Sequence, residues 1–351
     1  MYDLISELSN RSREIFRGVV ETFFETGEPV GSRTLSKTLR LDLSPATIRN
    51  VMADLEEYGL LYAPHKSAGR LPTDRGMRLF VDGLLQIGEL TNDERENIES
   101  RCAGNGRSLA AVLNETTEFL SGLTKTAGIV IAPKSDAAIN HVEFVLLSSG
   151  RALAIMVTKT GLVENRLIDL PIGFTPSSLV EAANYLNAQL MGRTLREAYT
   201  VITQELETHS TQLDALAARV VEAGLGTWSS DGEEPMLILR GRANLFDEVD
   251  AAVDLERLRQ LLNTLERKKG FLKVIEKTED GEGVHVFIGS ENRLFDLAGC
   301  SMIVAPLAGG GNETAPRPLG AIGVIGPTRL NYARIIPMVD YTARAISRLM
   351  G

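Results

Sequence analysis

The sequence predicts an α+β protein of several domains: a small helical N-terminal domain, then an antiparallel α/β domain interrupted by a mostly helical insertion. Three observations carry this prediction. The chain has 351 residues, enough for two or three domains of ordinary size. Residues 1–80 contain eleven cationic and eleven acidic side chains and are neutral, so the rest of the chain carries the whole net charge of −9. Short apolar runs typical of strands occur at residues 128–157 and again at 284–325, with helical patterns between them.

Composition excludes several classes of protein. Hydrophobic residues make up 44% and charged residues 24% of the chain, which is ordinary globular usage. The longest apolar runs, such as Ala152–Val157, are far shorter than the roughly 20 residues of a membrane helix. No secretory signal pattern opens the chain, so we expect a cytoplasmic protein. Two cysteines and four histidines are scattered, so we expect reduced thiols, no metal and no cofactor.

The N-terminal domain begins with two predicted helices. Apolar residues recur at helical spacing across residues 8–26, and Gly27 ends that helix. Ser32 is predicted to cap a second, short helix that turns Leu35 and Leu39 inward.

The third helix carries the clearest local signal in the chain. Ser44 is a preferred N-cap, Pro45 suits the first helical position, and Gly59 suits a left-handed C-terminal cap, so the helix is predicted over residues 45–58. Its core face consists of Ile48, Val51, Met52 and Leu55.

The opposite face of this helix has the layout of a helix that reads the major groove of DNA. Small and hydrogen-bonding side chains lie near its start, namely Ala46, Thr47, Arg49 and Asn50. The acidic residues Glu56 and Glu57 lie at its far end. The pattern predicts a helix-turn-helix.

A wing follows the third helix. Leu60–Ala63 is a predicted strand, Pro64–Pro72 a basic loop, and Thr73 the cap of another helix. Cations on such a loop can reach phosphates or the minor groove. Since helix-turn-helix units without DNA and solvated basic loops both occur, the pattern alone leaves these alternatives open.

Four sequence runs carry a resemblance to a known family. They are PVGSRTLS at 29–36, SPATIRNVMADL at 44–55, PHKSAGR at 64–70 and IGVIGPTR at 322–329, the last followed by Tyr332. These runs closely resemble the heat-inducible transcription repressor HrcA family of bacteria. Lys66 departs from the Thr that the family has in the wing, and it adds a cation.

The resemblance implies a repressor of heat-shock chaperone operons that binds an inverted-repeat operator as a homodimer. It also implies that a chaperonin keeps the repressor folded. Thr47, Arg49 and Asn50 are predicted to contact bases, and Lys66, Arg70 and Arg75 to contact phosphates. The complete set of candidate DNA-binding residues is Ser32, Arg33, Thr34, Ser44, Ala46, Thr47, Arg49, Asn50, His65, Lys66, Arg70 and Arg75.

The rest of the chain is predicted to form a sheet whose two halves are far apart in sequence. Its strands are 128–132, 141–147, 152–157, 284–288, 301–306 and 319–325, and its helices are 91–101, 108–125 and 332–350. The order of elements in Cys300–Arg348 is similar to the second half of a GAF domain.

Helical patterns dominate the segment between the two halves, at Ser177–Gln189, Leu206–Glu222 and Leu255–Lys269. By resemblance to the family, residues 166–274 are an inserted dimerisation domain. A winged-helix DNA-binding domain then covers residues 1–88, and a GAF-like domain covers 89–165 plus 275–351.

No catalytic constellation is evident, so we expect that the protein is not an enzyme. The glycines at 309–311, 320, 323 and 326 lack the Gly-Lys-Ser/Thr of a phosphate loop and the spacing of a dinucleotide fingerprint. An alternative is a winged-helix regulator that senses a small effector in its GAF-like domain. A third hypothesis is a metabolic enzyme with an appended DNA-binding domain, and the lack of a catalytic constellation weakens it.

Overall fold

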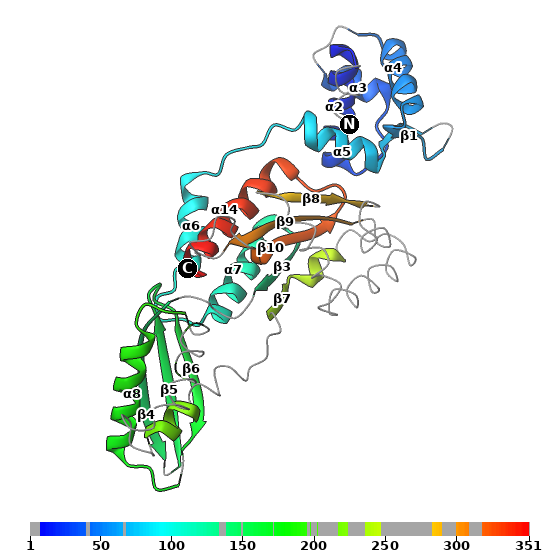
Figure 1. The fold of residues 1–351 in the computed structure, drawn as a ribbon. Coiled ribbons are helices and arrows are strands. Elements are labelled where there is room, and N and C mark those ends of the chain that lie inside the picture. Colours follow the sequence, from blue (N-terminus) through cyan, green and yellow to red (C-terminus); the bar gives the residue numbers. More distant parts are fainter. Residues whose placement is uncertain are drawn as a thin grey trace.

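The computed structural model describes three groups of elements that follow one another along the molecule (Figure 1). An N-terminal helical unit is followed by a five-stranded sheet with its helices, and a three-stranded sheet with one long helix lies beyond them. The described residues are 8–39, 43–65, 68–132, 138–148, 150–170, 172–194, 197, 202, 217–223, 236–246, 283–289, 300–308 and 318–350.

The N-terminal unit follows the predicted order of elements closely. Ser32 differs, because the N-cap of its helix is Gly31 and Ser32 is the first helical residue, only 8% exposed. The unit consists of α2 (Asn10–Thr26), α3 (Ser32–Thr38), α4 (Pro45–Glu57), β1 (Leu61–Tyr62), β2 (Leu71–Pro72) and α5 (Asp74–Gly83). Its core joins the apolar stripe of α2 to buried side chains of α3 and α4, including Leu35, Ile48 and Leu55.

The central unit is built on an antiparallel sheet with strand order β7-β3-β10-β9-β8. Helices α7 and α14 pack against one face of the sheet, α6 packs against both helices, and the short helix η1 contacts β3 and β10. The bounds are α6 (Asn92–Cys102), α7 (Leu109–Thr124), β3 (Ala127–Ala132), β7 (Met236–Arg240), η1 (Arg242–Leu245), β8 (His285–Ile288), β9 (Cys300–Ala308), β10 (Pro318–Pro327) and α14 (Tyr332–Met350).

The prediction of one interrupted sheet is wrong for residues 141–147 and 152–157. They form β4 (Ile139–Ser148) and β5 (Arg151–Thr158), which pair with β6 (Val163–Asp169) in a separate sheet. The burial patterns give the physical reason. Every residue of β3 is buried, as the centre of a covered sheet requires, whereas β5 alternates between buried and more exposed positions.

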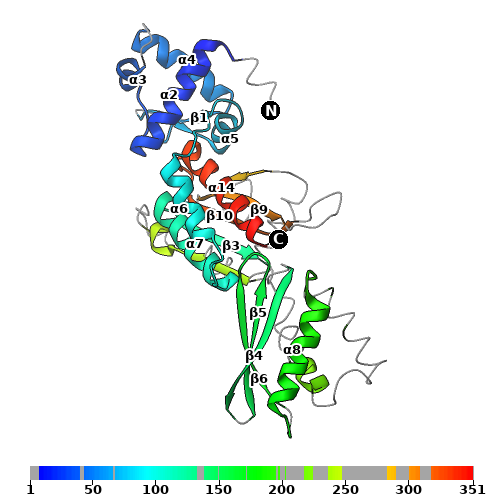
Figure 2. The same cartoon turned by 90° about the vertical axis from the view of Figure 1, so that its left-hand side faces the viewer.

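Helix α8 (Pro176–Leu190) lies along one side of the three-stranded sheet (Figure 2). It matches the helix predicted at 177–189. Strand β7 comes from within the predicted insertion, yet it pairs with β3 in the central sheet. Of the other two predicted helices, Leu206–Glu222 is described only over its last turns, which are helical from residue 217, and Leu255–Lys269 lies outside the described residues.

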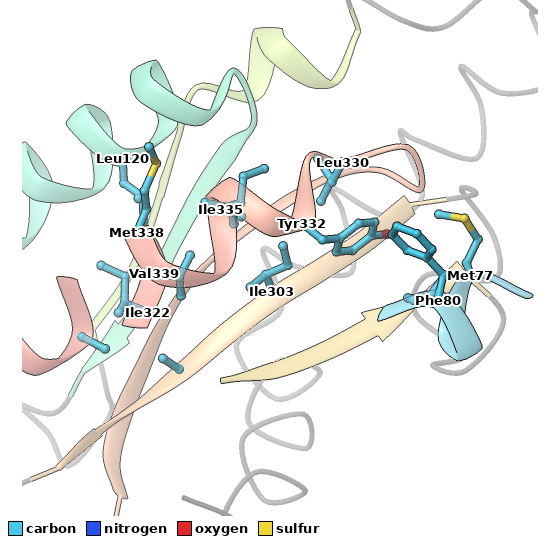
Figure 3. Packing of buried hydrophobic residues seen from close by; sticks show 14 of the residues in the cluster. Met77, Phe80, Leu120, Ile303, Ile322, Leu330, Tyr332, Ile335, Met338 and Val339 are labelled. Atoms are coloured by element: carbon cyan, nitrogen blue, oxygen red, sulfur yellow. The ribbon is translucent and has the colours of Figure 1, made fainter. Parts of the chain in front are cut away.

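An aromatic cluster joins the N-terminal unit to the central unit. The ring of Phe24 lies 5.6 Å from that of Phe80 and 5.7 Å from that of Tyr332, measured between centroids. Figure 3 shows Tyr332 at the start of α14 beside Phe80. The Tyr332 hydroxyl is within hydrogen-bond distance of Ser301 Oγ, at 2.8 Å, and of the Thr328 carbonyl, at 2.7 Å. One buried core therefore spans both units.

The segment between α5 and α6 is attached to α14. Pro337 lies inside α14 and has no N–H to donate to the Ala333 carbonyl, which accepts instead from the Gly88 N–H at 3.0 Å. The Glu94 carboxylate accepts from the Thr91 N–H and pairs with Arg334 at 2.6 Å. The hydrogen bond from Thr91 and the charge of Arg334 lower the pKa of Glu94.

The two cysteines are expected to be inert in the folded protein. Burial raises the pKa of Cys102 to about 11 and that of Cys300 to about 12, so both are protonated at pH 8. We expect no labelling by Ellman's reagent at pH 8 until the chain is unfolded in denaturant, when two equivalents should react. Rapid labelling of one equivalent in the native protein would contradict the buried placement.

Candidate nucleic-acid interface

Helix α4 has a well-formed start and end. The Ser44 hydroxyl accepts from the Thr47 N–H at 3.1 Å, and Pro45 occupies the first turn, which contains no acidic residue. The chain leaves the helix through Gly59, whose φ of 71° is left-handed. Ile48, Met52 and Leu55 are buried as predicted. This arrangement fixes which face of α4 meets solvent.

The exposed face of α4 is a stripe of four residues at helical spacing. The stripe follows the spacing of one helix face, with intervals of three, one and three residues. Its members are all exposed: Ala46, Arg49, Asn50 and Ala53. Thr47 is half-buried, and its hydroxyl lies 2.9 Å from Ser44 Oγ. The structure therefore exposes Arg49 and Asn50 to solvent and engages Thr47 and Ser44 in the cap.

A cleft of about 470 Å³ lies between the start of α3, the side of α4 and the base of the loop that joins β1 to β2. Arg33, Arg49 and Arg70 contribute to its wall, together with Ser32 and Gly69. Arg33 and its neighbour Thr34 are exposed. Three guanidinium-bearing residues thus line one cleft beside the exposed stripe of α4.

The remaining candidates are distributed around this cleft. His65 is exposed in the loop after β1, while Lys66 lies outside the described residues. Arg70 is only partly exposed and forms an ion pair of 2.8 Å with Glu56. Arg75 is exposed, and its guanidinium lies near Gly59, at the opposite end of α4 from Ala46. The structure does not bring Arg75 to the start of α4.

Sequence reasoning missed three residues that shape this region: Glu56, Val30 and Gly69. Glu56 was predicted only to lie away from the reading face. Val30 and Arg70 form an isolated antiparallel bridge. A Cβ atom on Gly69 would lie 2.4 Å from the Val30 carbonyl, so only glycine fits there. No local pattern connects positions so far apart in sequence.

Comparison with known proteins decides the family. The family model described as the HrcA protein C-terminal domain matches residues 110–336. A protein of Rhodopseudomonas palustris strain TIE-1, named heat-inducible transcription repressor HrcA, is 51% identical over 350 residues, covering 99% of this chain and 96% of that protein. The chain belongs to the HrcA family. A protein of the same name from Brucella canis is 52% identical over 353 residues, covering 99% of this chain and 98% of that protein.

A solved structure agrees with the fold of this HrcA-family chain. The crystal structure of a hypothetical protein at 2.2 Å resolution matches it with a TM-score of 0.65 and 24% identity, over 99% of this chain and 98% of that one. In the part of the chain that the structure describes, no three His, Cys, Asp or Glu residues are grouped to hold a metal ion. Among the same residues, no helix is long and apolar enough to cross a membrane.

Proposed function

We propose that this protein, a transcription repressor rather than an enzyme, reads its operator by inserting α4 into the major groove. The observation that carries the proposal is the exposed stripe of α4 beside the cationic cleft. The major groove is about 12 Å wide and admits a helix, and Asn and Arg side chains recognise base edges there. Arg33 and the loop after β1 would contact the flanking phosphates, which set orientation and salt dependence.

We propose that the repressor acts as a homodimer on an inverted repeat, because two half-sites require two readers in a fixed relation. The three-stranded sheet offers a surface for this contact on the face opposite α8. Val145, Leu153 and Leu167 are register neighbours across its three strands, and Val145 is 42% and Leu167 48% exposed. Leu147, further along β4, is 56% exposed. Exposed apolar patches of this kind mark protein interaction sites.

This proposal changes the part of the chain that forms the dimer. The family resemblance implies dimerisation by residues 166–274, whereas the open sheet face lies mainly within residues 139–169. The division into a DNA-binding domain (1–88), a GAF-like domain and an inserted domain remains a proposal. We propose that the inserted domain begins at about residue 138, because β4, β5 and β6 form a sheet of their own. Strand β7 belongs to the GAF-like domain in this division, because it pairs within the five-stranded sheet.

The chaperonin partner is likewise a proposal, drawn from the family resemblance. One structural feature supports it: Ala127 of β3 pairs with Ile325 of β10 near the end of the chain. Pairing between such distant segments is slow to form and leaves sheet edges unpaired during folding. A chaperonin that promotes refolding would then determine how much active cytoplasmic repressor is present, and heat-denatured proteins would compete for it.

One experiment tests the operator and the partner together. Genomic DNA fragments retained by the purified repressor are sequenced, with and without prior treatment of the repressor by chaperonin and ATP. We expect enrichment of an inverted repeat upstream of chaperone genes, with higher recovery after chaperonin treatment. Retention of fragments without a shared sequence would contradict operator reading. Equal recovery in both samples would contradict the chaperonin proposal.

A further inference from the structure

The ion pair between Arg70 and Glu56 joins the β1–β2 loop to the reading helix. Arg70 Nε and Nη2 both lie 2.8 Å from Glu56 Oε2. The Arg70 side chain is 23% exposed and that of Glu56 is 36% exposed. Fourteen residues separate them in sequence, so the contact fixes a tertiary relation and not a local one. Two donors on one carboxylate oxygen restrict the direction of the guanidinium.

The backbone of Arg70 is fixed as well. Its N–H donates to the Val30 carbonyl at 2.9 Å, and its carbonyl accepts from the Val30 N–H at 2.9 Å. Gly69 lies so close to the Val30 backbone that a side chain would clash. Arg70 Nη1 also lies 3.5 Å from the Ala68 carbonyl oxygen. Arg70 thus connects the segment before α3, the far end of α4 and the base of the loop.

We propose that Arg70 is a positioning residue: it holds the β1–β2 loop at a fixed angle to α4 through Glu56 and does not bind a phosphate itself. The inference rests on the proposed DNA-binding function and deepens it. The pair occupies donors of Arg70 that a phosphate would need, and Glu56 places a carboxylate beside them. The loop it holds carries His65, an exposed group that would contact the DNA backbone.

The two roles predict opposite signs for one substitution. If Arg70 bound phosphate, Glu56→Ala would remove a competing anion and strengthen DNA binding. If Arg70 positions the loop through Glu56, the same change weakens binding although it removes negative charge. Glu57→Ala is the matched control, because it removes the same charge from the adjacent, exposed position.

The test is titration of the full-length repressor and its variants with operator duplex at several salt concentrations. We expect Glu56→Ala and Arg70→Ala each to weaken operator binding about tenfold, the scale of one charge-assisted hydrogen bond. Both variants should lower the slope of log affinity against log salt by the same amount, because each misplaces the same loop and its phosphate contacts. The charge-swapped double variant Glu56→Arg with Arg70→Glu should recover most of the affinity.

Three results would overturn the inference: stronger binding by Glu56→Ala, a salt slope lowered in Arg70→Ala but not in Glu56→Ala, or no recovery in the double variant. Thermal unfolding of each variant separates loss of positioning from loss of folding, and the double variant retains the test if a single one is unstable. Wild-type protein that does not distinguish operator from random duplex would contradict the proposed function itself, before any variant is compared.

Discussion

Leu167→Asp is expected to convert the repressor into a monomer that binds operator at least a hundredfold more weakly. Leu167 lies on the open face of the three-stranded sheet, opposite Leu153 on the neighbouring strand. An aspartate there would bury an unpaired charge in the proposed interface, which costs several kcal/mol. Loss of the second reader removes an effective-concentration gain of about 10²–10⁴. Sedimentation and titration with inverted-repeat and half-site duplexes measure both effects.

Val180→Asp provides the matched control for this variant. Val180 is 59% exposed on α8, the helix on the other side of the same sheet. We expect it to remain a dimer and to bind operator as the wild type does. The proposed interface would be wrong if Leu167→Asp remained a dimer while Val180→Asp dissociated, and the contact would then lie on α8.

Asn50→Ala is expected to weaken operator binding by about 1–3 kcal/mol while leaving random duplex almost unaffected, because it removes a base contact. Asn50 is exposed in the N-terminal half of α4 and lies next to Arg49. The measurement is the ratio of the dissociation constants for operator and random duplex at one salt concentration.

Arg33→Ala is the comparison for Asn50→Ala, since Arg33 lines the cleft beside α4 and would contact phosphate. It should weaken both duplexes alike and lower the salt slope by about one. An unchanged operator-to-random ratio in Asn50→Ala would mean that the reading face of α4 is assigned wrongly.

The N-terminal unit could be predicted from sequence because its signals are local. Ser44, Pro45 and Gly59 define the ends of α4 within a few residues of each other, and the apolar spacing fixes its inner face. The Arg70–Glu56 contact depends on tertiary approach, so no local signal predicts it. Ser32 was predicted as a cap because its residue type suits that position, whereas the backbone places Gly31 there.

The body was predicted less completely because strand pairing is not local. The patterns at 141–147 and 152–157 indicate strands correctly but do not say which sheet they join. Strand β6 and strand β7 were not predicted. Polar residues interrupt β6, and β7 is only five residues long within a region dominated by helical patterns. The alternation of burial along β5 appears only in the structure, because residues 152–157 are all apolar and show no alternation in the sequence.

Pro337 leaves the Ala333 carbonyl free to accept a hydrogen bond from Gly88. This hydrogen bond affects which spacing between operator half-sites the protein can bind. The segment between α5 and α6 is held along α14, so α4 keeps a set distance and rotation from the central unit of its own chain. In the proposed dimer, the two α4 helices would therefore be held at one fixed separation. Moving one half-site by about five base pairs turns it to the opposite side of the duplex, since a helical turn is about 10 base pairs. A dimer with a fixed separation would bind that spacing weakly, whereas a dimer with flexible linkers would tolerate it.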